Sequence, residues 1–266
     1  MRRRLVKGAL SAAKGLGLSK LARAIVARLP ARFGARFESR VYDLRRTAGS
    51  SHVAVDELHA LLAEALDALR ARTGTNDLGD YLEFGVYSGG TMTAADRART
   101  ALGLERMRLI GFDSFEGMSD HAAAEAPHRF APGMFRCSAD EARENLRGAG
   151  VDLDRVHFVE GWFDETLTER TRRARAIDRA AVIMLDCDVY SSSRAALQFS
   201  AQAIHDAAIV VCDDWVHSGP AGQQRAFHEF LAANELEAEP FGHYRASGHP
   251  DGGRVFIVSR RRAAAA

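Results

Sequence analysis

From residue 80 onward, short apolar segments alternate with helical segments, and this alternation constrains the fold more than any other feature of the chain. Apolar runs of four to six residues predict strands, and the longer amphipathic runs between them predict helices. Repeated β-α-β units predict an α/β fold with a doubly wound, mostly parallel sheet and helices on both faces. The predicted strands are residues 81–86, 107–112, 156–160, 181–186, 207–212 and 255–258, and the predicted helices are residues 91–101, 139–148, 165–174, 192–205 and 222–234.

The residues before this domain predict a basic, helical N-terminal extension over residues 1–79. Of the 36 basic and 35 acidic residues, 13 and two fall in the first 50 positions, so that segment carries +11 and the rest of the chain −10. Leucine, isoleucine and valine recur at helical spacing over 18–29 and again over 53–72. We expect the first of these helices to dock on its own or a neighbouring subunit, as an oligomer contact or lid. The alternative is that its basic face binds a membrane surface. Residues 261–266 predict a disordered tail after the domain at 80–260.

Composition narrows the class of protein. Three cysteines are too few for a disulfide scaffold and lack metal-finger spacing. No apolar run is long enough to span a bilayer, and no clean signal-peptide cleavage site follows the basic start. The acidic domain argues against nucleic acid as a partner. We therefore expect a cytoplasmic protein.

The first two predicted strands end in residues that suit a nucleoside ligand. In parallel sheets, ligands lie beyond the carboxyl ends of the strands. Glu83 precedes a turn with Gly85, Gly89 and Gly90, where a ligand can approach the backbone, and its carboxylate suits the ammonium of an amino-acid-like ligand. Asp113 stands where a carboxylate commonly holds a ribose diol, with an Asx turn as the alternative.

The fourth and fifth predicted strands end in four aspartates. Asp186 and Asp188 are two residues apart and can point into one cleft, and Asp213 and Asp214 follow the neighbouring strand. Crowded carboxylates repel one another, and a divalent cation relieves that repulsion. Oxygen ligands favour Mg²⁺, with Mn²⁺ as an alternative, and the lack of a neighbouring histidine or cysteine cluster argues against zinc. The alternative is that these aspartates are helix caps and turn residues.

Five ordered segments together resemble the macrocin O-methyltransferase (TylF-like) family. They are residues 82–91 (LEFGVYSGGT), 111–117 (GFDSFEG), 161–167 (GWFDETL), 184–190 (MLDCDVY) and 213–215 (DDW). The resemblance covers about residues 82–230 and implies a Rossmann-like fold of the class I type that uses S-adenosylmethionine (SAM). It further implies methylation of a hydroxyl on a small, sugar-bearing natural product, as in antibiotic biosynthesis, and a homo-oligomer.

The resemblance also implies roles for individual residues of this chain. SAM contacts are expected from the turn after the first strand, from Asp113 on the ribose and from Gly161-Trp162 near the adenine. Ser138 is a further candidate for an adenine contact in this family, but it equally fits a capping box with Glu141. Three of the four aspartates are expected to bind the metal. The fourth, Asp188, is left as the general base. The implied SAM contacts are Glu83, Gly85, Tyr87, Ser88, Asp113, Ser138, Gly161 and Trp162, and the implied metal ligands are Asp186, Asp213 and Asp214.

A Mg²⁺ shell of three aspartates, a water and two substrate oxygens favours a vicinal diol as acceptor. His128, in a predicted loop over 120–135 that would cover the acceptor, is a second candidate base, because histidine titrates near neutral pH. Two other hypotheses stay open from the sequence. One is a catechol-type O-methyltransferase acting on an aromatic diol, and the other is a non-catalytic SAM-binding protein that keeps the fold.

Overall fold

The computed structural model describes residues 54–261, which divide into two compact units. One unit is Glu116–Cys137, and the other holds the remaining described residues and the whole sheet. The predicted N-terminal helix at 18–29, the basic arm and residues 262–266 lie outside the described residues. Within those described, no helix combines the length and apolar character needed to cross a membrane.

The sheet has seven strands in the order β3-β2-β1-β4-β5-β7-β6. The first five are parallel, and β7 runs antiparallel between β5 and β6. The predicted α/β fold with a mostly parallel sheet is confirmed. The strands are β1 (Asp80–Phe84), β2 (Leu109–Asp113), β3 (Val156–Glu160), β4 (Ala180–Leu185), β5 (Ala207–Cys212), β6 (Leu236–Ala246) and β7 (His249–Arg260).

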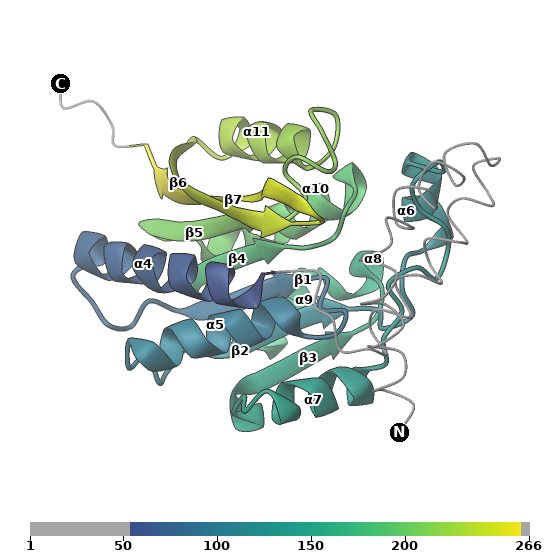
Figure 1. The fold of residues 1–266 in the computed structure, drawn as a ribbon. Coiled ribbons are helices and arrows are strands. Elements are labelled where there is room, and N and C mark those ends of the chain that lie inside the picture. The colour runs from purple at the N-terminus through teal and green to yellow at the C-terminus, as the bar shows by residue number, and fades with distance from the viewer. Residues whose placement is uncertain (1–53, 262–266) are drawn as a thin grey trace. The chain divides into compact units, whose positions relative to one another are not determined.

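The helices of the larger unit form two layers around this sheet (Figure 1). In one layer α4 packs on α5, which also contacts α7; in the other, α10 contacts α8 and α11. The helices are α4 (Val55–Thr73), α5 (Gly90–Ala101), α7 (Ala139–Gly148), α8 (Phe163–Thr166), α9 (Glu169–Ala174), α10 (Tyr190–Ser200) and α11 (Gln223–Ala233), with 3₁₀ turns at Leu153–Arg155 and Ala201–Ala203.

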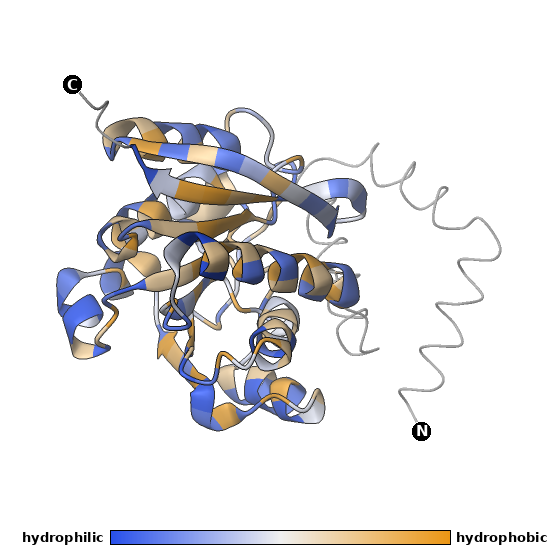
Figure 2. Cartoon of the chain, turned by 90° about the vertical axis from the view of Figure 1, so that its left-hand side faces the viewer, coloured by the Kyte–Doolittle hydropathy of each residue, from blue (hydrophilic) through white to orange (hydrophobic). Residues whose placement is uncertain are grey.

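Burial explains why these segments form strands. Every residue of β1, β4 and β5 is buried, as expected for central parallel strands covered on both faces. Figure 2 shows the inner strands coloured mainly hydrophobic, whereas the helices carry both hydrophilic and hydrophobic residues. The stacked rings of Phe84 and Phe112, with centroids 5.0 Å apart, lie in this core. Burial of the core therefore fixes the positions of the strand ends.

Three departures from the sequence predictions concern one helix and two strands of the sheet. The predicted helix over 165–174 is two short helices, α8 and α9. Strand β6 was not predicted, because it contains Pro240 and Gly242 and lies at an edge of the sheet, with only three of its 11 residues buried. Strand β7 is longer than predicted because it pairs with strands on both sides.

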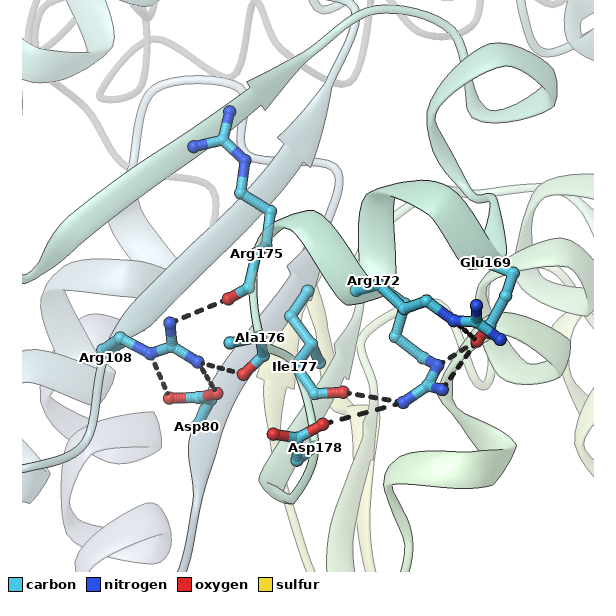
Figure 3. Close-up of polar contacts among 9 residues, drawn as sticks. Asp80, Arg108, Glu169, Arg172, Arg175, Ala176, Ile177 and Asp178 are labelled. Carbon is cyan, nitrogen blue, oxygen red and sulfur yellow. Dashed lines mark hydrogen bonds and ion pairs between the residues drawn. The ribbon is translucent and has the colours of Figure 1, made fainter.

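Hydrogen bonds of Arg108 connect the amino ends of β1 and β2 with the residues after α9 (Figure 3). The guanidinium of Arg108 donates two hydrogen bonds to the carboxylate of Asp80, at 2.8 and 2.6 Å. It also donates to the backbone carbonyls of Arg175 and Ala176, at 2.9 and 2.8 Å, just after α9. This network lies at the end of β1 opposite to the glycine turn, so its function is to support the fold.

Candidate functional site

The turn after β1 passes directly over the end of β4. Gly85 has φ of 93° and Gly89 has φ of 84°, both in the left-handed region that favours glycine. A Cβ atom on Gly85 would lie 1.9 Å from the backbone oxygen of Asp186. Glycine is therefore required here for close approach of two backbones. The turn and the first aspartate of the β4 end lie side by side as a result.

Glu83, the acid inside the first turn motif, is fully buried and has two hydroxyl partners. Its carboxylate accepts hydrogen bonds from the hydroxyl of Tyr81 at 2.5 Å and from that of Thr91 at 2.6 Å. Burial raises the pKa of Glu83 to about 8, against the lowering effect of these hydroxyls. Tyr81 and Thr91 were missed from the sequence, although the two-residue spacing of Tyr81 and Glu83 places both on one face of β1. A SAM contact by Glu83 stays a prediction.

Asp113, at the end of β2, ties the first turn to the second strand. One carboxylate oxygen accepts from the backbone amides of Val86 and Tyr87, at 2.7 and 2.9 Å. The other accepts from the amide of Phe115 at 2.7 Å, which is the Asx turn named above as the alternative. Burial raises the pKa of Asp113, and the three amides oppose that shift. Because a carboxylate accepts about four hydrogen bonds, little capacity remains for the predicted ribose contact, which is untested.

The other predicted SAM contacts lie on the loops after the strands. Ser138 caps α7, since its hydroxyl accepts from the amide of Glu141 at 3.2 Å, as the capping alternative predicted. The amide of Gly161 donates to the carbonyl of Asp113 at 3.0 Å, which sets the start of the loop after β3 beside the end of β2. Trp162 is half-buried and precedes α8, and the carbonyl of Ser88 accepts from Asn145 at 3.3 Å.

The structure brings together the three predicted metal ligands. Asp186 follows β4, Asp213 and Asp214 follow β5, and the pairing of Leu185 with Cys212 sets the two strand ends level. One carboxylate oxygen from each aspartate lies within 4.8 Å of the others. Asp213 and Asp214 are buried, while Asp186 is half-buried. We name Asp186, Asp213 and Asp214 the aspartate cluster.

The aspartate cluster fits a hard divalent cation. Burial, and then repulsion by Asp213 and Asp214, raises the pKa of Asp186 well above its ordinary value. Burial, and then repulsion by Asp214, raises the pKa of Asp213 to about 7. A divalent cation would offset this repulsion, and an all-carboxylate group without histidine or cysteine, as found within residues 54–261, suits Mg²⁺ or Mn²⁺.

Two polar residues hold the strand ends that carry the cluster. The buried side chain of Gln223, from α11, donates to the carbonyl of Leu185 at 3.2 Å and accepts from the amide of Asp214 at 3.1 Å. The hydroxyl of Tyr244, from β6, donates to the carboxylate of Asp213. Sequence reasoning missed both, because nothing local in the sequence links them to residues nine and 31 positions away.

The two candidate bases lie in different units. Asp188 follows the cluster's first aspartate with φ of 63°, and its backbone amide donates to a carboxylate oxygen of Asp214 at 2.9 Å. His128 is exposed and belongs to the unit Glu116–Cys137. The prediction that 120–135 is a loop was wrong in part, because α6 (Asp120–Glu125) forms there, capped by the hydroxyl of Ser119. The choice between the two bases stays a prediction.

Comparison with known proteins identifies the family and agrees with the fold. The profile of the macrocin-O-methyltransferase (TylF) family matches residues 57–243. The chain belongs to this family. The match includes α4, so the family resemblance extends further toward the N-terminus than the sequence motifs indicated.

Two curated members match about half or more of the chain. One is the 8-demethyl-8-(2,3-dimethoxy-alpha-L-rhamnosyl)-tetracenomycin-C 4'-O-methyltransferase of Streptomyces olivaceus, 32% identical over 143 residues, covering 52% of this chain and 53% of that protein. The other is the demethyldecarbamoylnovobiocin O-methyltransferase of Streptomyces niveus, 29% identical over 173 residues, covering 62% and 63%. The chain thus spans between half and two thirds of the length of these relatives.

Solved structures of methyltransferases share the fold. The O-methyltransferase NovP superposes with a TM-score of 0.59 at 24% identity, covering 76% of this chain and 79% of that one. The calicheamicin methyltransferase CalS11 gives a TM-score of 0.54 at 22% identity, covering 73% and 77%. These likenesses and the strand order identify a Rossmann-like fold of the class I methyltransferase type.

Proposed function

We propose that this protein is a metal-dependent O-methyltransferase that moves the methyl group of SAM to a hydroxyl of a small, sugar-bearing natural product. The observation that carries the proposal is the aspartate cluster at the ends of β4 and β5, with the glycine turn of β1 packed against it. Membership of the macrocin O-methyltransferase family supports the reaction class.

The aspartate cluster would hold the cation. Asp186, Asp213 and Asp214 each offer one carboxylate oxygen, which leaves room in a six-oxygen shell for a water and two hydroxyls of a vicinal diol. When bound, Mg²⁺ or Mn²⁺ would orient the acceptor diol and lower the pKa of one of its hydroxyls. The half-exposed Asp186 gives the acceptor a side from which to approach.

Asp188 is the base that we assign to the acceptor hydroxyl. Its amide is bonded to Asp214, so its backbone is fixed next to the cluster, and its φ of 63° is a strained conformation of the kind found at functional sites. The carboxylate would take the hydroxyl proton as the acceptor oxygen bonds to the methyl carbon. The carbon–sulfur bond breaks in the same step, and its electron pair stays on sulfur as S-adenosylhomocysteine. His128 is the alternative base.

The SAM site that we propose follows the ends of β1, β2 and β3. The glycine turn lets the cofactor approach the backbone, with contacts from Tyr87 and Ser88. Asp113 and the start of the following loop at Gly161 are bonded to each other, so the proposed ribose and adenine contacts are adjacent. The task of these residues is to hold the methyl group in line with the acceptor oxygen.

A sugar acceptor is supported by the relatives. The name of the Streptomyces olivaceus enzyme states a rhamnosyl-bearing tetracenomycin as its substrate and the 4' oxygen as its target. We extend this to the present chain only as an acceptor class, a deoxysugar with a free hydroxyl, without choosing the aglycone. The sugar named for that relative is already methoxylated at positions 2 and 3, so the vicinal diol that we propose rests on the aspartate cluster and not on this relative.

The test is methyl transfer from radiolabelled SAM to a panel of glycosylated polyketides and aminocoumarins, with simple catechols beside them. We expect transfer to a glycoside that stops with EDTA and returns with Mg²⁺. Full activity in EDTA would contradict metal dependence. Transfer to catechols alone would favour the catechol-type alternative, and SAM binding without any turnover on the panel would favour the non-catalytic one.

A further inference from the structure

Asp213, Gly253 and Tyr244 lie next to one another at the edge of the aspartate cluster. Strand β5 ends at Cys212, which pairs with Arg254 of β7, so Asp213 follows β5 on the side where Gly253 precedes Arg254. Gly253 in turn pairs with Tyr244 of β6. To reach Asp213, the side chain of Tyr244 therefore has to pass over β7 at the glycine.

Gly253 provides the space for this crossing. A Cβ atom at Gly253 would lie 2.4 Å from two carbons of the Tyr244 ring and 2.8 Å from its hydroxyl oxygen. Any side chain there would displace the ring. The ring itself is 2% exposed, and its hydroxyl donates to Oδ1 of Asp213. The sheet thus contains a buried aromatic donor that reaches across a whole strand to one carboxylate.

The hydrogen bond between Tyr244 and Asp213 lies inside the sheet, because both residues are buried. Held in this way, the carboxylate of Asp213 cannot rotate without breaking a buried hydrogen bond.

We propose that Tyr244 is a positioning residue for the metal ligand Asp213: its hydroxyl holds Oδ1 and thereby fixes how the other oxygen is presented to the cation. The proposal rests on the metal-dependent function above. It goes beyond the family match, which ends at residue 243. Partners of this kind orient metal ligands, and their loss commonly weakens metal affinity about 10- to 100-fold.

The test is Mn²⁺ binding by the full-length protein without SAM or acceptor, read from the electron paramagnetic resonance signal of free Mn²⁺. We expect Tyr244→Phe to weaken Mn²⁺ binding by roughly 10-fold or more. The matched control is Val258→Ala, which removes buried atoms from the same strand pair, five residues from Gly253, without touching the carboxylate. It should lower the melting temperature but leave Mn²⁺ affinity near that of the wild type.

A second variant tests whether the side chain of Tyr244 needs the space at Gly253 to pass over β7. Gly253→Ala should displace the ring and weaken Mn²⁺ binding, and combining it with Tyr244→Phe should add little, because both changes remove one contact. Equal Mn²⁺ affinity of wild type and Tyr244→Phe would overturn the proposal, as would equal losses in Tyr244→Phe and Val258→Ala. Failure of the wild type to bind Mn²⁺ would instead overturn the metal-dependent function.

Discussion

The affinity of the aspartate cluster for a divalent cation should depend steeply on pH. A cation binds the ionised carboxylates, so protons that the cluster holds at a given pH must leave first. Burial and the neighbouring Asp214 raise the pKa of Asp213 to about 7, and the pKa of Asp186 is raised well above its ordinary value. Exposed carboxylates are already ionised at pH 6 and would show no such dependence.

The size of the effect follows from these pKa values. With a pKa of about 7, the carboxyl of Asp213 is roughly 90% protonated at pH 6 and roughly 10% protonated at pH 8. One proton of this kind lowers the apparent cation affinity about tenfold between pH 8 and pH 6, and a second proton, on Asp186, makes the loss larger.

Isothermal titration with Mg²⁺ at pH 6, 7 and 8, in two buffers with different ionisation enthalpies, measures both the affinity and the protons released. We expect more protons to be released per bound Mg²⁺ at pH 6 than at pH 8. Asp213→Asn removes one titrating group and should bind more weakly, with a shallower pH dependence. An affinity that is flat from pH 6 to pH 8, with no proton release, would refute the reasoning.

The buried carboxyl groups of Asp213 and Glu83 should make the cation-free protein less stable as pH rises. Groups whose pKa is raised by folding stabilise the fold below their unfolded pKa, near 4, and lose that contribution as pH rises through the folded values. Those values are about 7 for Asp213 and about 8 for Glu83. The melting temperature in EDTA should therefore fall between pH 5 and pH 9. At pH 8, Mg²⁺ should reverse most of the part of this fall that the aspartate cluster causes.

Three substitutions, two of them with a matched control variant, test other parts of the structure. Asp188→Asn should lower the methyl-transfer rate about a hundredfold or more, while SAM affinity by titration stays near that of the wild type; a loss of SAM affinity with normal turnover would contradict its assignment as base. Gly85→Ala, with its left-handed φ and a Cβ that would strike the β4 end, should cost about 2–5 kcal/mol in urea unfolding. Gly74→Ala, also left-handed but in open space, should cost only about 1 kcal/mol. Arg108→Met leaves a buried carboxylate without its partner and should cost about 2–3 kcal/mol. Arg106→Met, from an exposed pair at 3.4 Å, should cost less than about 0.5 kcal/mol, and equal costs for the two arginines would contradict the role of the network.

The sequence predicted those parts of the fold that depend on local pattern. Strands β1, β4 and β5 are buried along their whole length, so each appears as an apolar run, and with β2 and β3 they were placed to within two residues at each end. The aspartates could be found for the same reason: they follow the buried runs directly, and in a parallel sheet the carboxyl ends of neighbouring strands lie at one edge. That rule predicted that four aspartates gather, and the structure groups three of them, Asp186, Asp213 and Asp214; this set of three is the one that the family resemblance implied as metal ligands.

Partners that come from distant elements could not be found from the sequence. Glu83 and Asp113 looked like residues facing a ligand, yet the fold surrounds each with protein donors, two hydroxyls for the first and three backbone amides for the second. Burial of a carboxyl group requires such donors, but which residues provide them depends on how the turn and helix pack. Strand β6 was missed because an edge strand has one neighbour and little buried surface to shape its sequence.

What the sequence alone determined, then, is the order of strands and helices and the set of acids at their ends, because both follow from periodicity and position along the chain. Tertiary structure decided how those acids are held. Tyr244 reaches Asp213 only because β7 lies between β5 and β6 and has a glycine at the crossing point. Gln223 joins the ends of β4 and β5 only because α11 begins beside them. Such contacts join residues far apart in the chain, and they exist only once the sheet has closed around its core.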